Sequence, residues 1–296
     1  MDTTDSVSVQ SGFTYMGRKF SDLSLNDNSS SAFSDCNSDR SGEFPTASSQ
    51  SRRLFLSCAS DNSDEVISQL VSDLDSNNID EQKQAAMEIR LLAKNKPDNR
   101  IKIARAGAIK PLVSIISSND PQLQEYGVTA ILNLSLCDEN KERSPTPGRS
   151  SRWLSQVEEN KIAIGRSGAI PPLVDLLEGG NFRGKKDACT ALYSLCSVKE
   201  NKMKAVQAGI MKPLVEMMSD LGSNMVDKSA FVLSLLVSVA EARAALVEEG
   251  GIPVLVEIVE VGTQRQKEIA VAILLQLCED CLAYRTMVAR EGAIPP

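Results

Sequence analysis

The chain has 296 residues, a formal net charge of −7 and no histidine. A negative chain is unsuited to binding a nucleic-acid backbone, and the missing histidine excludes Ser-His-Asp and Cys-His catalysis and histidine-ligated zinc. No apolar run reaches the roughly 18 residues expected of a membrane-spanning helix. The odd number of cysteines, several of them inside helical apolar patterns, predicts reduced thiols and a cytoplasmic or nuclear protein.

Residues 1–63 are predicted to form a disordered tail. They are rich in serine, with asparagine, aspartate and glycine between the serines, and their aromatic residues follow no period. Such a segment cannot bury enough surface to offset the entropy lost on ordering. Basic residues precede serines in Arg18–Ser21 and Arg52–Ser57. Phosphorylation is one interpretation of these two places, and an unmodified linker is the other.

From residue 64 onward one phrase returns along the chain. It reads "AGAIKPLVSIIS" from Ala106, "SGAIPPLVDLLE" from Ser167, "AGIMKPLVEMMS" from Ala208 and "EGGIPVLVEIVE" from Glu249. The glycines that anchor the phrase are Gly107, Gly168, Gly209, Gly250 and Gly292, at spacings of 61, 41, 41 and 42 residues. We expect them at turns where the backbone takes a positive φ.

Each period predicts three helices. A short first helix precedes the glycine, an apolar second helix follows it, and a longer amphipathic third helix comes next. Such a unit cannot bury its apolar face alone, so neighbouring units are expected to stack around one continuous core.

The Gly-Ala-Ile-Pro-Pro-Leu-Val phrase with its 41-residue period resembles the armadillo repeat over residues 64–296. This resemblance implies an all-α, right-handed superhelical solenoid, and the two-helix HEAT repeat is the alternative. Four stretches further resemble the armadillo array of plant U-box ubiquitin ligases and their armadillo-only relatives: Asn181–Lys202, Ala208–Met218, Met225–Ala270 and Met287–Pro296.

The 61-residue step breaks this period. Glu-Asn-Lys occurs at Glu139–Lys141 and again at Glu159–Lys161, and the prolines and glycine between the two copies argue against a third helix there. Two explanations fit: some 20 residues were inserted, or about half a repeat was lost and replaced by unrelated sequence. We favour loss, because "LSQVEENK" looks like the end of a repeat and an inserted loop has no reason to end in this way. We therefore predict repeats at 64–141 and 160–296, with a truncated last repeat and a disordered segment at 142–159 between the two blocks. Stacking is expected to survive, because a longer loop adds little closure entropy.

The armadillo resemblance implies that the third helices line a groove for an extended peptide, which asparagine side chains hold. The asparagine position reads Asn133, Ser194, Leu235 and Gln276 in successive repeats. Because only the first repeat keeps the asparagine, importin-like binding of basic localisation signals is disfavoured.

Basic residues gather at the other end of two third helices. They are Arg183, Lys185, Lys186, Arg265 and Lys267. These residues predict binding of an acidic or phosphorylated segment of a partner protein. A solvated face, salt-bridged to Asp187 and Glu268, is the alternative. The Cys278–Cys281 pair is expected to belong to the core, because structural zinc takes four ligands.

Together these features predict a non-catalytic protein-interaction scaffold without metal or cofactor. By resemblance, its setting is target recognition in ubiquitin-linked signalling. A U-box ubiquitin ligase is one alternative, although the 63 residues before the repeats lack the regular apolar pattern of a U-box. A nuclear transport receptor is the other.

Overall fold

The computed structural model describes residues 14–15, 18–19, 63–136, 147–279 and 281–292. It contains two compact units, residues 1–43 and residues 44–296. In the first unit, strands β1 (Thr14–Tyr15) and β2 (Arg18–Lys19) pair in antiparallel fashion. The rest of the predicted disordered tail lies outside the described residues, so that expectation stays a prediction.

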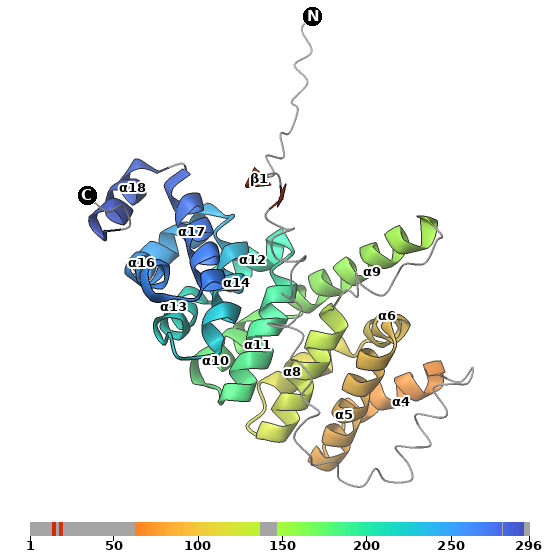
Figure 1. The fold of residues 1–296 in the computed structure, drawn as a ribbon. Coiled ribbons are helices and arrows are strands. Elements are labelled where there is room, and N and C mark those ends of the chain that lie inside the picture. The colour runs from red at the N-terminus through yellow and green to blue at the C-terminus, as the bar shows by residue number, and fades with distance from the viewer. Residues whose placement is uncertain (1–13, 16–17, 20–62, 137–146, 280, 293–296) are drawn as a thin grey trace, which may run out of the picture. The chain divides into compact units, whose positions relative to one another are not determined.

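The second unit is an array of helices that follows the predicted three-helix period (Figure 1). The first helices of the period are α6 (Pro97–Arg105), α9 (Pro147–Arg166), α12 (Lys199–Gln207), α15 (Ala240–Glu248) and α18 (Leu282–Arg290). The second helices are α4 (Ser63–Leu74), α7 (Ile109–Ile116), α10 (Ile170–Gly179), α13 (Met211–Ser219) and α16 (Gly251–Val261). The third helices are α5 (Ile79–Asn95), α8 (Pro121–Ser135), α11 (Phe182–Leu195), α14 (Met225–Leu236) and α17 (Gln264–Glu279).

Local signals explain where these helices begin. Asp120 accepts hydrogen bonds from the Gln122 and Leu123 N–H groups at the start of α8, and Asn181 accepts one from the Gly184 N–H at the start of α11. The five anchor glycines all have positive φ, from +72° to +93°. The expectation of a left-handed turn between each first and second helix is therefore confirmed.

Helices of the same kind pack on one another along the array. Among the third helices, α5 packs on α8, α8 on α11, α11 on α14, and α14 on α17. A leucine lies five residues after each of four anchor glycines, and all four are 0% exposed: Leu112, Leu173, Leu214 and Leu255. Burying each of these side chains is worth up to about 3 kcal/mol. The repeats thus share the continuous core that their sequence predicts.

A buried asparagine ties each of three first helices to the preceding third helix. Asn99, Asn160 and Asn201 lie eight residues before an anchor glycine, and their exposed fractions are 6%, 7% and 0%. The side-chain amides donate to carbonyls in the last turn of α5, α8 and α11, at 3.3, 3.5 and 3.0 Å respectively. Each amide therefore adds a side-chain donor to a carbonyl at the end of the preceding third helix.

An arginine makes this bond in the two repeats that lack the asparagine. Ala242 and Tyr284 stand at the asparagine position, and the next residue in each case is an arginine. Arg243 donates to the Val237 carbonyl at 3.0 Å, and Arg285 donates to the Glu279 carbonyl at 2.6 Å. Both side chains therefore bond to carbonyls at or just beyond the end of the preceding third helix, as the asparagines do.

The predicted disordered segment at 142–159 is wrong from residue 147 onward, because α9 occupies residues 147–166. Pro147 begins this helix, where a missing N–H is tolerated, and no further proline follows before the helix ends. The later part of α9 serves as an ordinary first helix: Val157 is buried with Ile101 of α6.

The second Glu-Asn-Lys copy therefore keeps the repeats in register. Asn160 donates to the Leu134 carbonyl of α8, and α8 still packs on α11. The expectation that stacking survives the 61-residue step is confirmed. The first copy, Glu139–Lys141, lies outside the described residues, and the choice between insertion and loss stays open.

Candidate protein-interaction surface

The stacked third helices carry most of the predicted site residues. Two of these side chains make hydrogen bonds to the neighbouring third helix. The Asn133 amide donates to the Arg90 carbonyl of α5 at 2.9 Å, and the Ser194 hydroxyl donates to the Ser135 carbonyl of α8 at 2.8 Å. Asn133 is 7% exposed and Ser194 is 8% exposed. These side chains join neighbouring third helices through hydrogen bonds inside the protein. Leu235 and Gln276, at the same position in later repeats, are half-buried.

The predicted basic residues form two groups, one at the start of α11 and one at the start of α17, with α14 between them. In the first group, the Arg183 guanidinium lies 2.7 Å from the Glu125 carboxylate of α8, and its side chain remains 40% exposed. Lys185 and Lys186 are half-buried. In the second group, the Arg265 guanidinium lies over the Phe231 ring of α14 at 4.9 Å. Lys267 donates to the Glu260 carbonyl of α16 at 2.8 Å.

A row of aromatic and arginine side chains also joins the third helices, and the sequence prediction named only one of them, Arg265. The Arg90 guanidinium lies 4.7 Å from the centre of the Tyr126 ring, and Tyr193 meets Phe231 edge-on at 6.3 Å between ring centres. We name the aromatic–arginine band after its members: Arg90, Tyr126, Tyr193, Phe231 and Arg265. Tyrosine and arginine are among the residue types that contribute most to protein–protein binding. The sequence signal was the occurrence of aromatic residues on three third helices of a chain poor in them.

Asp187 is a buried group rather than a surface partner of the basic residues. It is 3% exposed, and the Thr129 hydroxyl lies 3.5 Å from its carboxylate. Burial raises the pKa of Asp187, and nearby Arg183 partly opposes this rise. Asp187 also lines a cavity of about 20 Å³ with residues of α8, α10 and α11, which is large enough for a water molecule. The expected salt-bridged surface therefore uses Glu125 in place of Asp187.

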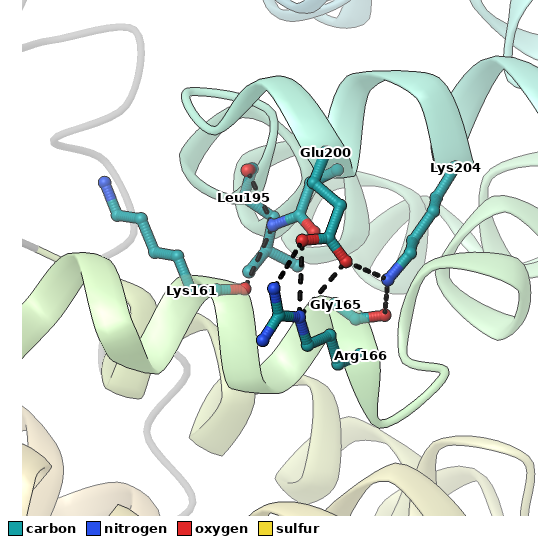
Figure 2. A network of polar contacts seen from close by, with 7 residues as sticks. Lys161, Gly165, Arg166, Leu195, Glu200 and Lys204 are labelled. Atoms are coloured by element: carbon teal, nitrogen blue, oxygen red, sulfur yellow. Dashed lines mark hydrogen bonds and ion pairs between the residues drawn. The ribbon is translucent and has the colours of Figure 1, made fainter.

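The first helices carry a second polar cluster, which links α9 to α12 (Figure 2). The Glu200 carboxylate accepts from Arg166, at 3.1 Å from Nη2, and from Lys204 at 2.8 Å. The Lys204 ammonium also donates to the Gly165 carbonyl at 3.1 Å. Hydrogen bonds from Arg166 and Lys204 lower the pKa of Glu200 to about 2. The cluster is an ion pair between partly exposed side chains of neighbouring repeats, and it joins α9 to α12.

The cysteine pair of the last repeat lies at the end of α17 and just before α18. Cys278 and Cys281 are both half-buried, so Cys278 is less enclosed than the core position expected for it. Cys196, its counterpart two repeats earlier, is 0% exposed. Across residues 63–136, 147–279 and 281–292, no group of three or more Cys, Asp or Glu side chains could hold a metal ion. None of the helices there is long and apolar enough to cross a bilayer.

Two family models match the helical array. Residues 96–136 match the armadillo/β-catenin-like repeat, and residues 152–292 match the ARM repeat region of plant U-box proteins. Residues 152–292 are thus similar to the ARM repeat region of plant U-box proteins. The resemblance inferred from the repeated phrase is thereby confirmed, and the three-helix ARM unit is preferred over the HEAT alternative.

The curated relatives of this ARM array are plant U-box proteins. U-box domain-containing protein 12 of Arabidopsis thaliana is 40% identical over 116 residues, which are 39% of this chain and 15% of that protein. E3 ubiquitin-protein ligase SPL11 of Oryza sativa is 47% identical over 94 residues, which are 32% of this chain and 13% of that protein. The matched part of the chain thus spans less than a sixth of the length of either relative.

Solved structures agree with the armadillo fold. One is a crystal structure of computationally designed armadillo repeat proteins for modular peptide recognition. It gives a TM-score of 0.66 at 21% identity, and the match covers 77% of this chain and 89% of the designed chain. A designed armadillo repeat protein in complex with the peptide (KR)4 gives a TM-score of 0.63 at 22% identity, with the same two coverages. At these identities the likeness establishes the fold alone.

The Arg183–Glu125 pair is expected to contribute modestly to the stability of the ARM array. A double-mutant cycle with Arg183→Gln and Glu125→Gln should give a coupling free energy of about 0.5 kcal/mol, because both side chains are partly exposed and water screens their attraction. Urea denaturation measures the coupling, which should shrink when salt is added. A coupling that is independent of salt would show that the pair does not act through its charges.

The Glu200 cluster is expected to stabilise the ARM array at neutral pH and to lose this effect in acid. Because the pKa of Glu200 falls from its ordinary 4.5 to about 2 on folding, its contribution is complete above 4.5 and disappears as the pH falls toward 2. Glu200→Gln should therefore lower the melting temperature at about pH 6 by more than at about pH 3. Thermal unfolding of both proteins across this range measures the difference, and a pH-independent difference would contradict the assignment.

Proposed function

We propose that this chain is a non-catalytic interaction scaffold, which binds partner proteins along its stacked third helices. The observation that carries the proposal is the aromatic–arginine band, in which two arginines and two tyrosines, residue types favoured at protein interfaces, lie on consecutive third helices with the buried Phe231. The plant U-box family of the array supports a setting in ubiquitin-linked signalling, in which the scaffold selects a target. The proposal places the protein in the cytoplasm, the nucleus or both, and a fluorescent fusion would test this location.

The partner segment proposed for this face is acidic or phosphorylated. The guanidinium of Arg183 carries five N–H donors in a planar fork, and Glu125 occupies one side of it. The 40% exposure of the side chain leaves room for a phosphate or carboxylate to share the guanidinium. Lys185 and Lys186 lie on the same turn and add positive charge. Asn133 and Ser194 are buried and bond within the protein, which argues against importin-like binding of basic signals.

A charge-reversal comparison tests the binding face. The first variant carries Arg183→Glu, Lys185→Glu and Lys186→Glu. The matched control carries Arg105→Glu, Lys110→Glu and Lys199→Glu, three exposed cations that lie on α6, α7 and α12 and not on a third helix. Affinity capture from cell extract identifies partners, and each one is then purified and its Kd measured against both variants.

The expected result is loss of binding in the first variant with binding kept in the control. An unchanged Kd in both variants would place binding on another surface. Circular dichroism of each variant checks that the array stays folded, because Arg183→Glu also places a carboxylate beside Glu125.

The alternative function, ubiquitin ligase activity, rests on the name of one relative, E3 ubiquitin-protein ligase SPL11. The match covers 13% of that protein, so the name does not extend to the array alone. We expect no ubiquitin chains when the purified full chain is mixed with ubiquitin, activating enzyme and conjugating enzyme. Chain formation in that mixture would make the protein an enzyme and refute the scaffold proposal.

A further inference from the structure

An exposed aromatic side chain lies beside the basic residues at the start of α11. Phe182 is the first residue of this helix, and its side chain is 59% exposed. In the part of the chain whose side chains the structure describes, the other exposed large apolar residues are aliphatic or methionine. A phenyl ring that a partner removes from water contributes strongly to binding. Phe182 is therefore a candidate contact point.

The repeat itself does not require an aromatic residue at this place. Phe182 stands 14 residues after its anchor glycine, and the equivalent residues of three other repeats are Pro121, Ser223 and Gln264. Those repeats stack without a ring there. The residues 15, 17 and 18 positions after the glycine are all basic in this repeat, whereas the other three repeats have at most two basic residues at these positions. The exposed ring and three cations thus coincide in one repeat.

Helical spacing brings the ring and the cations together on the surface of α11. Residues three and four apart are neighbours on a helix, so Phe182 lies beside Lys185 and Lys186. Arg183 lies beside Lys186 in the same way. An anion held by Arg183 and Lys186 would therefore lie next to the phenyl ring.

The start of α8 adjoins this part of α11. Pro121, the exposed first residue of α8, and Asn181, the N-cap of α11, line the same cavity of about 20 Å³. The Glu125 carboxylate of α8 also reaches Arg183 at 2.7 Å. A segment that crosses the starts of both helices would meet Pro121 and the ring of Phe182 as an apolar strip with the cations beside it.

The charge of this surface favours an anionic occupant, although the whole chain has a net charge of −7. The three cations outnumber the Glu125 carboxylate that is paired with Arg183. A phosphate group carries a charge of about −1.5 to −2 and three acceptor oxygens, so it can accept from an arginine and a neighbouring lysine at the same time. We name the Phe182 patch after its members: Pro121, Phe182, Arg183, Lys185 and Lys186.

We infer that the Phe182 patch binds an extended segment of a partner protein in which an aromatic residue adjoins a phosphoserine. The phosphate accepts hydrogen bonds from Arg183 and Lys186, and the aromatic side chain covers Phe182, because aromatic rings pair favourably edge-to-face or offset. This inference rests on the proposed function and deepens it, since it names the residue type beside the phosphate. Arg183 supplies charge, and Phe182 determines which phosphorylated segments bind.

The probe is a fluorescent peptide with the sequence Gly-Ala-Phe-pSer-Phe-Ala-Gly, in which pSer is phosphoserine. The matched peptide has alanine in place of both phenylalanines. A phenylalanine on each side of the phosphoserine makes the test independent of the direction of the bound segment. Fluorescence anisotropy with the full chain measures both Kd values. We expect the phenylalanine peptide to bind roughly fivefold more tightly than the alanine peptide.

Substitutions in the protein assign this difference to the ring. Phe182→Ala should remove the difference and leave the Kd of the alanine peptide unchanged. The control Val261→Ala shortens an apolar side chain that is 65% exposed at the end of α16, and it should keep the difference. Arg183→Gln should weaken the binding of both peptides. Thermal unfolding checks that the three variants stay folded.

The outcomes separate this inference from the proposed function. Equal Kd values for the two peptides, both weakened by Arg183→Gln, would overturn the inference and leave the proposed function intact. Binding of both peptides that Arg183→Gln leaves unchanged would count against both. Absence of saturable binding by the phenylalanine peptide would overturn the inference. Equal affinity of a peptide with glutamate in place of phosphoserine would overturn the assignment of a phosphate.

Discussion

Replacing Gly165 with alanine is expected to destabilise the ARM array by about 2–3 kcal/mol. A Cβ atom at this position would lie 1.8 Å from the side-chain oxygen of Asn201 and 2.6 Å from its Cγ. Asn201 cannot withdraw easily, because its amide nitrogen donates to the Lys161 and Leu195 carbonyls, both at 3.0 Å. The gain in helix propensity from glycine to alanine, about 1 kcal/mol, is too small to offset this clash. Urea denaturation measures the change.

Gly179→Ala is the matched control for this prediction. Gly179 is the last residue of α10, and an added Cβ atom would have no heavy atom within 4 Å. The free energy of unfolding should change by less than about 0.5 kcal/mol. Equal destabilisation by the two alanine substitutions would show that the close approach of α9 to α12 is not the cause.

Asn201→Ala is expected to destabilise the ARM array by about 2–3 kcal/mol. The side chain is 0% exposed, and its loss leaves the Lys161 and Leu195 carbonyls without this donor in a buried place. Asn224→Ala is the control, because Asn224 precedes α14 without a side-chain capping bond and is exposed. Thermal or urea unfolding should separate the two variants clearly, and similar stabilities would refute the role given to Asn201.

The two substitutions are also expected to interact. In the double variant, the shortened side chain at position 201 leaves space for the Cβ atom added at position 165, so the combined loss should be smaller than the sum of the single losses. Additive losses would mean that the residues act independently. The cycle therefore tests the contact itself as well as its consequence.

Much of the fold could be predicted from the sequence because its signals are local. Glycines that need a positive φ and apolar residues with helical spacing act within a few residues, and both recur with the repeat. The prediction failed at residues 147–159 because Pro145 and Pro147 suggested a loop throughout the segment. Pro147 instead begins α9, and the residues after it are free to continue the helix.

The candidate site was harder to predict because its contacts join different repeats. Asn133 bonds to Arg90 and Ser194 bonds to Ser135, over separations of 43 and 59 residues. Such partners depend on how the helices stack, which helical periodicity does not specify. The Arg265–Phe231 contact of the aromatic–arginine band depends on stacking in the same way. The recurring Glu-Asn-Lys tripeptide was visible in the sequence, but only the structure shows which backbone carbonyls its asparagine bonds to.

The bond from Asn160 to α8 has a practical consequence for protein engineering. It joins α8 to the later part of α9, so we expect the stack to tolerate a change in the length of the chain between them. An epitope tag or a small reporter domain grafted between residues 141 and 146 should leave the melting temperature of the array almost unchanged. A cargo attached there is then expected to leave the scaffold intact.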